Sequence, residues 1–500
     1  MLELIALVSG ALVMVLEMVG ARVMAPHLGT SVIVWTSLIG VVLACLALGA
    51  WLGGRMADRT VSRARLAAIL ALAGCGTALT GLLHSTVADA VAASVSSLHM
   101  AAVLCAILLL SLPATFFGMV TPYVIRLRME DVSSSGRTVG TLYALSTVGS
   151  IAGTFLGGFV LVSWFGSTHI LLGTGAGMLL LSLLACPSPA KVRSALLALI
   201  CLGGWASASY QAFEEAASGA RTVETPYNHI RIVRGLDHEG RELLCLATDP
   251  GRFQSAMYVD DPAGLALPYT RFFALGPALV PDARRVLMLG GGAFSVPRWL
   301  LAGRSALDPS TLGVDVVELD PGMTRAAREH FGLAEDPRLR VVHEDARTFC
   351  NRNTERYDLV FVDVFGSCYT IPFQAGTEEA AAAMRRAVKE NGALVMNVIA
   401  SLDGGAGRLF RSIHAGLARH FAEVLVFAVT DPADPETIQN LMLLALPVPR
   451  PDLARTLAGS DDPALAPILA ARVTAPVPSA PPLRDDFAPV ERYSLALLPR

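Results

Sequence analysis

Residues 285–292 have the sequence RVLMLGGG, an apolar run that ends in three consecutive glycines. Three more mostly apolar runs follow, and each ends at a carboxylate: residues 314–317 before Glu318, 339–342 before Glu344 and Asp345, and 359–362 before Asp363. Such runs, separated by helix-length polar segments, predict parallel strands that alternate with helices. In an open sheet of this kind, ligands bind at the carboxyl ends of the strands. Residues 285–363 therefore predict a ligand site at one sheet edge.

The glycines and the first two carboxylates favour a nucleoside ligand. Gly290, Gly291 and Gly292 let the backbone approach a ligand closely, because glycine has no Cβ. Glu318, at the end of the next strand, is placed to accept hydrogen bonds from ribose hydroxyls. Asp345 ends the third strand, where an adenine amino group could be held. The dinucleotide pattern G-x-G-x-x-G is absent, which favours S-adenosylmethionine or its decarboxylated relative over a dinucleotide.

Asp363 is the candidate catalytic residue, because it ends the strand beside the reactive end of such a ligand. Its carboxylate could act as general base, or orient an amine that attacks a sulfonium carbon; the alternative is an aspartate that caps a helix. Gln254 follows a glycine turn and could face the ligand, although a solvated glutamine fits the spacing as well.

The composition divides the chain into parts. It is 53% hydrophobic and 16% charged, whereas roughly a quarter of residues are charged in average soluble proteins. We expect a multi-span α-helical membrane domain followed by a small β segment and an α/β Rossmann-like, doubly wound sheet of the S-adenosylmethionine-dependent transferase type. The expected parts are a transmembrane domain (1–210), a β-hairpin segment with a connecting helix (221–283), the Rossmann-like domain (284–446) and a Pro/Ala-rich C-terminal tail (447–500).

The first part contains six apolar runs close to the length of about 20 residues that spans a bilayer. They lie at residues 4–24, 31–53, 66–84, 100–124, 139–163 and 169–186, and a shorter seventh candidate lies at 194–210. Alternate loops contain arginines and lysines, which predicts that these loops are cytoplasmic. The protein is thus expected in the plasma (inner) membrane. Its soluble part is expected in the cytosol if the seventh run does not cross, and outside if it does.

Charge and cysteine content exclude other partners. The formal net charge is −3 and no basic block is present, so nucleic acid is not an expected partner. The eight cysteines form no CxxC pair, so neither a metal site nor a disulfide framework is indicated. The expected partners are the lipid bilayer, a small-molecule acceptor (an amine or a membrane-delivered compound) and a second copy in a homodimer.

These residues resemble the spermidine synthase (polyamine aminopropyltransferase) family, in particular its membrane-fused branch with an N-terminal multi-span region. The motifs are residues 25–31, 35–36 and 53–58 in the apolar half, and 290–292, 317–321, 344–347, 357–363, 371–372, 391–392 and 485–491 in the soluble half. The resemblance implies that Glu318 holds the ribose hydroxyls and Asp345 the adenine amino group. It also implies that Gln254 and Tyr269 line the aminopropyl channel, and that Asp363 is the catalytic aspartate.

The chain departs from the family's pattern at the reactive end. Gly-Gly-Gly-Asp-Gly has become Gly-Gly-Gly followed by Ala293 and Phe294. Gly366 stands where the family has a second aspartate, and Thr270 and Arg271 stand where it has His-Glu. Because a diamine needs anionic partners, putrescine is in doubt as the acceptor.

Three hypotheses follow. The first is an aminopropyltransferase-like enzyme that transfers or releases the arm of a sulfonium donor and leaves methylthioadenosine. The second is an S-adenosylmethionine-dependent methyltransferase on the same fold. The third is a nucleoside-binding membrane transporter or sensor without catalysis, suggested by Glu17 and Arg22 within the first apolar run, because charges inside a membrane are costly.

Overall fold

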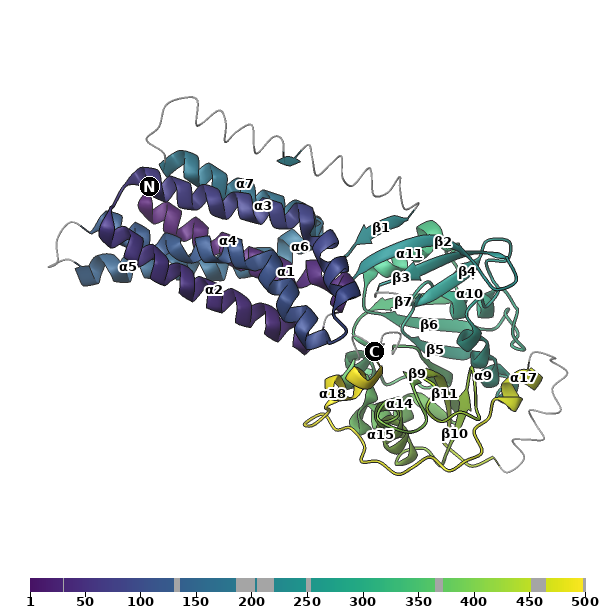
Figure 1. Cartoon of the computed structure of the whole chain (residues 1–500). Coiled ribbons are helices and arrows are strands. Elements are labelled where there is room, and N and C mark those ends of the chain that lie inside the picture. Colours follow the sequence, from purple (N-terminus) through teal and green to yellow (C-terminus); the bar gives the residue numbers. More distant parts are fainter. Residues whose placement is uncertain are drawn as a thin grey trace. The chain divides into compact units, whose positions relative to one another are not determined.

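The computed structural model describes residues 1–29, 31–129, 135–185, 203–204, 220–248, 253–364, 372–450 and 465–497. The chain divides into two compact units between residues 219 and 220. Figure 1 shows the helices of the first unit and the mixed α/β structure of the second. Each unit is described by itself.

The described residues of the first unit form six helices that are long and apolar enough to cross a membrane, as the sequence predicted. They are α1 (Leu2–Leu28), α2 (Val32–Arg59), α3 (Arg63–Ser94), α4 (Leu98–Arg128), α5 (Ser135–Phe155) with its π-helical continuation η2 (Leu156–Leu161), and α7 (Ser167–Ala185). The short α6 (Val162–Trp164) follows η2. The proposed seventh span, residues 194–210, lies almost wholly outside the described residues.

Glycines bring these helices into backbone contact. A Cβ on Gly49 of α2 would lie 2.0 Å from the carbonyl oxygen of Thr115 in α4. A Cβ on Gly153 of α5 would lie 2.1 Å from the carbonyl oxygen of Ala11 in α1. Neither position could accept a side chain without moving a helix. The small residues therefore serve helix packing, the usual role of small-xxx-small faces in membranes.

The second unit begins with a four-stranded antiparallel sheet in the order β1-β2-β3-β4. Its strands are β1 (Arg221–Glu224), β2 (His229–Leu236), β3 (Glu242–Ala247) and β4 (Ser255–Tyr258). The sequence predicted the β2–β3 hairpin, whose turn is held by Asp237, which accepts hydrogen bonds from the backbone N–H groups of Glu239 and Arg241. The four-residue strands β1 and β4 were not predicted.

A seven-stranded sheet in the order β10-β11-β9-β8-β5-β6-β7 forms the centre of this unit. Its strands are β5 (Arg285–Leu289), β6 (Gly313–Glu318), β7 (Leu339–His343), β8 (Tyr357–Val362), β9 (Val388–Ala400), β10 (Glu423–Ala428) and β11 (Gln439–Leu446). The five strands that are adjacent in the order β9-β8-β5-β6-β7 pair in parallel. Strand β11 is antiparallel to both β9 and β10. The predicted Rossmann-like, doubly wound sheet is confirmed.

Helices cover both faces of this sheet. They are η3 (Pro268–Ala274), α9 (Leu275–Leu279), α10 (Ser295–Leu301), α11 (Pro321–His330), α12 (Ala346–Arg352), α13 (Phe373–Gly376), α14 (Glu378–Ala387), α15 (Arg408–Ala418), α17 (Leu465–Ala470), α18 (Val490–Ser494) and η4 (Leu495–Leu497). The segment expected as one connecting helix is instead a 3-10 turn, η3, that continues into α9.

Successive strand residues point to opposite faces, so the sheet has two cores. We call the face that η3 covers the η3 face. Its core contains Met288, Phe361 and Val395, which pack with residues of η3, α9 and α10. The opposite face packs Leu289, Val362 and other strand residues with α12, α14 and α15. Because both faces are covered, the central strands are apolar almost throughout.

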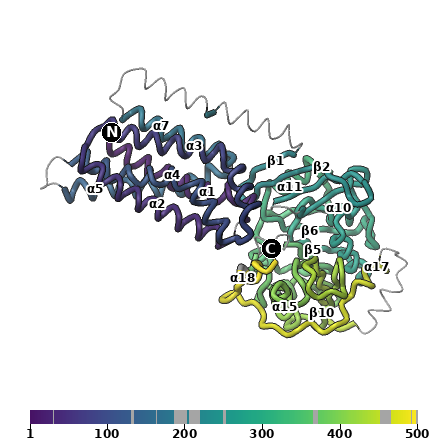
Figure 2. Tube along the Cα trace, viewed as in Figure 1, coloured from purple at the N-terminus to yellow at the C-terminus, as the bar shows by residue number. Residues whose placement is uncertain are grey.

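The described part of the C-terminal segment, residues 465–497, contributes to both cores. Leu465 and Ile468 pack in the core of the η3 face, and Leu483 and Val490 pack in the core of the opposite face. Figure 2 shows the segment running along the outside of the second unit between α17 and α18.

Candidate functional site

The predicted site residues lie at the carboxyl ends of four adjacent strands. The glycines 290–292 follow β5, Glu318 ends β6, Asp345 follows β7 and Asp363 follows β8. β5 pairs with both β6 and β8, and β6 pairs with β7. The structure therefore brings these residues to one sheet edge, where ligands of such sheets bind.

The glycine turn folds over the neighbouring strand end. Gly290 has φ 89°, and a Cβ there would lie 2.4 Å from the carbonyl oxygen of Asp363. Gly292 also has a positive φ, 52°. Side chains are strained in that conformation. The close approach of this turn to Asp363 therefore requires glycine.

Glu318 lies buried beneath the turn. Its Oε2 accepts hydrogen bonds from the N–H groups of Gly291 (2.8 Å) and Gly292 (3.2 Å), and its Oε1 accepts from Asp320 N (2.9 Å). Burial raises the pKa of Glu318, and these three hydrogen bonds oppose the rise. A carboxylate has about four acceptor positions, so a ribose that used both hydroxyls here would displace one backbone N–H group.

Asp320 ties this strand end to the four-stranded sheet. The residue is fully buried. Its Oδ2 accepts hydrogen bonds from the Thr225 hydroxyl (2.6 Å) and the Asn228 amide (2.8 Å), and its Oδ1 accepts from Gly322 N (2.8 Å). The β1–β2 connection therefore holds the segment in which Glu318 lies.

Asp345 begins α12 as its N-cap. Its Oδ1 accepts a hydrogen bond from Thr348 N at 2.9 Å. Arg347, in the first turn of the same helix, donates to Asp485 Oδ2 at 2.7 Å. The contact of Asp345 with adenine stays a prediction.

Asp363 is held from two sides. Its Oδ2 accepts a hydrogen bond from the Tyr269 hydroxyl (3.0 Å), and its Oδ1 accepts from Asn397 Nδ2 (2.9 Å). Burial raises the pKa of Asp363, and the two hydrogen bonds oppose the rise. Burial and the neighbouring Asp363 carboxylate raise the pKa of Tyr269, which keeps the phenol a donor. Within the described residues, the carboxylate thus accepts from side chains of η3 and β9 rather than from the first turn of a helix.

Gln254 and Tyr269 lie next to each other. The Tyr269 hydroxyl is 3.3 Å from the carbonyl oxygen of Gln254, and Gln254 Oε1 accepts a hydrogen bond from Thr248 N at 2.7 Å. Gln254 Nε2 is buried and has no hydrogen-bond partner within the described residues. The NH₂ group of Gln254, next to Tyr269, is thus left for a ligand, although its role stays a prediction.

Asn397 was not predicted as part of the site. It is buried in β9, and its Oδ1 accepts a hydrogen bond from Asn440 Nδ2 of β11 at 2.9 Å. Asn397 interrupts the apolar run 393–400, whereas the half-buried Asn440 lies near the start of β11. A buried amide needs hydrogen-bond partners. That requirement was the signal in the sequence that could have indicated Asn397.

The departures from the family's pattern have clear structural consequences. Ala293 and Phe294 are fully buried, and Phe294 adopts a left-handed conformation with φ 57°. Arg271 turns to the carbonyl oxygen of Leu265 and the hydroxyl of Tyr258. Gly366 lies outside the described residues.

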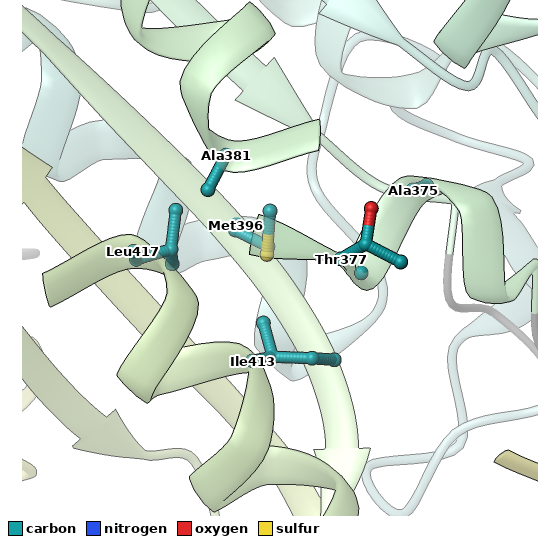
Figure 3. Close-up of a pocket in the computed structure, with 7 residues that line it drawn as sticks. Ala375, Thr377, Ala381, Met396, Ile413 and Leu417 are labelled. Carbon is teal, nitrogen blue, oxygen red and sulfur yellow. The ribbon is translucent and has the colours of Figure 1, made fainter. Parts of the chain in front are cut away.

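A small apolar pocket lies on the opposite face of the sheet from Asp363. Figure 3 shows its lining by Ala375, Thr377, Ala381, Met396, Ile413 and Leu417. Met396 and Asn397 are consecutive in β9, so their side chains point to opposite faces. This pocket is therefore separate from the candidate site.

Together, the strand order, the glycine turn and the strand-terminal carboxylates define a Rossmann-like fold of the S-adenosylmethionine-dependent transferase type. No family model matches the chain. The polyamine aminopropyltransferase of Vibrio vulnificus (strain CMCP6) is 27% identical over 216 residues, which are 42% of this chain and 68% of that protein. That of Corynebacterium efficiens (strain DSM 44549) is 25% identical over 268 residues, 47% of each chain.

A solved structure, that of a probable spermidine synthase from Corynebacterium glutamicum ATCC 13032, is 25% identical with a TM-score of 0.40, covering 49% of this chain and 88% of that one. The similarity in sequence confirms the predicted resemblance to the polyamine aminopropyltransferases. The chain spans only about half the length of the Corynebacterium efficiens relative. Its donor, acceptor and site residues are matters for proposal.

Proposed function

We propose that this protein is a membrane-bound, spermidine synthase-like enzyme that uses an S-adenosyl-type sulfonium donor. The donor is decarboxylated S-adenosylmethionine or S-adenosylmethionine. Its aminopropyl-type arm passes to an amine, and methylthioadenosine remains. The observation that carries the proposal is Asp363, a carboxylate at the end of β8 that Tyr269 and Asn397 hold beside the glycine turn.

In the proposed reaction, the amine nitrogen attacks the arm carbon that is bonded to the sulfonium. The new C–N bond forms as the C–S bond breaks, and the electron pair of that bond returns to sulfur. Asp363 accepts the proton that the nitrogen loses, for which its ionised form is needed. Most of the rate enhancement then comes from positioning, because the neutral thioether is already a good leaving group.

Several residues support a sulfonium nucleoside as the ligand. Glu318 would hold the ribose, Asp345 the adenine amino group, and Gln254 and Tyr269 the arm. The buried Nε2 of Gln254, without a partner within the described residues, is a donor that suits a polar ligand. Gly290, Gly291 and Gly292 would let the backbone approach the nucleoside.

The acceptor that we propose carries fewer positive charges than a diamine. Ala293 is fully buried where the family's pattern has the aspartate that grips the donor's amino group, and Thr270 and Arg271 stand where it has His-Glu. A dicationic acceptor would therefore lack anionic partners. An isolated ammonium is costly to bury. A monoamine, or an amine delivered from the membrane, avoids this cost.

The six apolar helices support a membrane location. We propose that the second unit faces the cytosol, because basic residues gather where α2 meets α3 and at the end of α4. Arg59 ends α2, Arg63 and Arg65 lie in the first turn of α3, and Arg126 and Arg128 lie in the last turn of α4. A C-terminal fusion to green fluorescent protein, which fluoresces in the cytosol, tests the side. Fluorescence is expected, whereas activity of a C-terminal alkaline phosphatase fusion would contradict it.

Incubation of the purified full-length protein with each donor separately tests the reaction. Mass spectrometry of the nucleoside is expected to find methylthioadenosine, which requires the arm to leave. S-adenosylhomocysteine would instead identify a methyltransferase. Binding of either donor without any product from monoamines or diamines would favour the sensor hypothesis.

A further inference from the structure

Asn440 is linked to the candidate catalytic carboxylate through one intervening side chain. Asn440 Nδ2 donates to Asn397 Oδ1 at 2.9 Å, and Asn397 Nδ2 donates to Asp363 Oδ1 at 2.9 Å. The three residues come from β11, β9 and the end of β8, which are adjacent strands. A chain of hydrogen bonds therefore crosses three strands and ends at Asp363.

Strand register explains why these side chains meet. Asn397 is opposite Met442 in the β9–β11 pair, and Asn440 is two residues from Met442 on the same strand. Since alternate residues of a strand share a face, Asn440 points to the same face as Met442, which packs in the η3 face. Tyr269 of η3 approaches Asp363 from this face as well.

The chemistry of the groups fixes the direction of the hydrogen bonds. An ionised carboxylate only accepts hydrogen bonds, so Asn397 must present its NH₂ group to Asp363. The Asn397 carbonyl oxygen then faces away and needs a donor. Asn440 supplies that donor, whereas an acceptor at position 440 would favour the reversed amide.

We propose that Asn440 is a positioning residue of the active site, which keeps the NH₂ group of Asn397 directed at Asp363. The proposal rests on the proposed function, in which Asp363 accepts a proton. Asn440 itself touches no reacting atom. Its effect is on the orientation and the ionisation of Asp363.

The surroundings of Asp363 make its ionisation sensitive to this amide. Within the described residues, Tyr269 from η3 and Asn397 from β9 donate to the carboxylate. Glu318 of β6 is engaged by the backbone of the glycine turn. If the Asn397 amide reversed, its oxygen would face Asp363 Oδ1, and the protonated form of Asp363 would be favoured.

Two variants of Asn440 separate this role from simple packing. Asn440→Asp keeps the shape but offers Asn397 an acceptor, so we expect the amide to reverse. Asn440→Leu removes the donor and adds no charge. For Asn440→Asp, the acid limb of kcat/KM is expected to move to higher pH, with about a tenfold loss of activity on the acid side for each pH unit that the limb moves.

The kcat at alkaline pH and the KM for the donor show whether a loss of activity comes from the ionisation of Asp363. At alkaline pH, Asn440→Asp should recover most of its kcat, and its KM for the donor should stay near the wild-type value. Asn440→Leu should lower kcat with a smaller movement of the limb. An acid limb at the wild-type position in Asn440→Asp, or a loss that is equal at every pH, would overturn the proposal.

A second measurement does not depend on turnover. Thermal stability of wild type, Asn440→Leu, Asp363→Asn and the double variant forms a double-mutant cycle on the full chain. Coupled effects are expected because both residues act on Asn397, while additive effects would overturn the proposal. An inactive wild type with coupled stabilities would refute the proposed function and leave the Asn440 link supported.

Discussion

Phe294 offers a prediction in which two structural effects oppose each other. Its φ of 57° and ψ of 33° are left-handed, and it is the one non-glycine residue with positive φ among the described residues. Its ring is fully buried in the core of the η3 face and lies over Gly291, whose Cβ position would be 2.8 Å from Phe294 Cε2. The variants Phe294→Ala and Phe294→Gly remove the same ring but differ in backbone strain.

The magnitudes decide the order of stability. Removal of a buried phenylalanine ring costs about 3–5 kcal/mol. Left-handed backbone costs a residue with a Cβ about 1–2 kcal/mol, which glycine avoids, while the freedom of glycine in the unfolded chain costs about 0.4–1 kcal/mol. Both variants should be several kcal/mol less stable than wild type. The glycine variant should be more stable than the alanine variant by about 0 to 1.6 kcal/mol.

Hydrogen exchange followed by mass spectrometry on the full-length protein measures this difference at β5 and α10. Trp299, the one tryptophan in the sequence after residue 219, adds a local fluorescence signal. Phe273 provides the matched control, because it is equally buried in the same core but lacks a positive φ. There, the glycine variant should be less stable than the alanine variant. The same order at both positions would refute the role of backbone strain at Phe294.

Three further predictions concern the site, a buried thiol and the membrane helices. Asp363→Asn should lower kcat by about a hundred- to ten-thousand-fold, and unchanged turnover would exclude Asp363 as the base. The acid limb of kcat/KM of the wild type should lie above the usual aspartate pKa of about 3.9, because burial raises the pKa of Asp363. Cys350 should resist iodoacetamide in the folded protein and react after denaturation, because burial raises its thiol pKa to about 12. Peptide mapping measures the labelling in the two states. Rapid labelling of the folded protein would contradict the burial of Cys350. Gly153→Leu should disrupt the α1–α5 contact, since its Cβ would lie 2.1 Å from the Ala11 carbonyl oxygen. Gly140→Leu is the control, because a Cβ at Gly140 would meet no atom within 4 Å. Equal thermal stability of the two variants in detergent would count against this packing.

Much of the Rossmann-like domain followed from local sequence patterns. The apolar run before residues 290–292 and the carboxylates after the next three runs placed the sheet edge, because strand ends and turns have local sequence signals. Pro321, at the first position of α11, marked a helix start as proline often does. The strands β1 and β4 were missed because four residues show too little periodicity to distinguish a strand from a loop.

The interactions around Asp363 and Glu318 could not be predicted in the same way. Asn440 and Asp363 are far apart in the sequence, and their link depends on the register of β9 against β11. The engagement of Glu318 by the glycine turn depends on backbone directions that the sequence does not contain. Residue types predicted which groups are chemically competent, whereas strand pairing determined which groups meet.

The central claim is that Asp363 serves the transfer of an aminopropyl-type arm from a sulfonium nucleoside. The most direct measurement uses decarboxylated S-adenosylmethionine with an isotope label in the arm, a panel of monoamines and diamines, and full-length wild type beside Asp363→Asn. We predict that mass spectrometry will find the label in a new secondary amine, with an equal amount of unlabelled methylthioadenosine, and that Asp363→Asn will form far less of both. Equal product from both proteins, or no labelled amine from any acceptor, would contradict this claim.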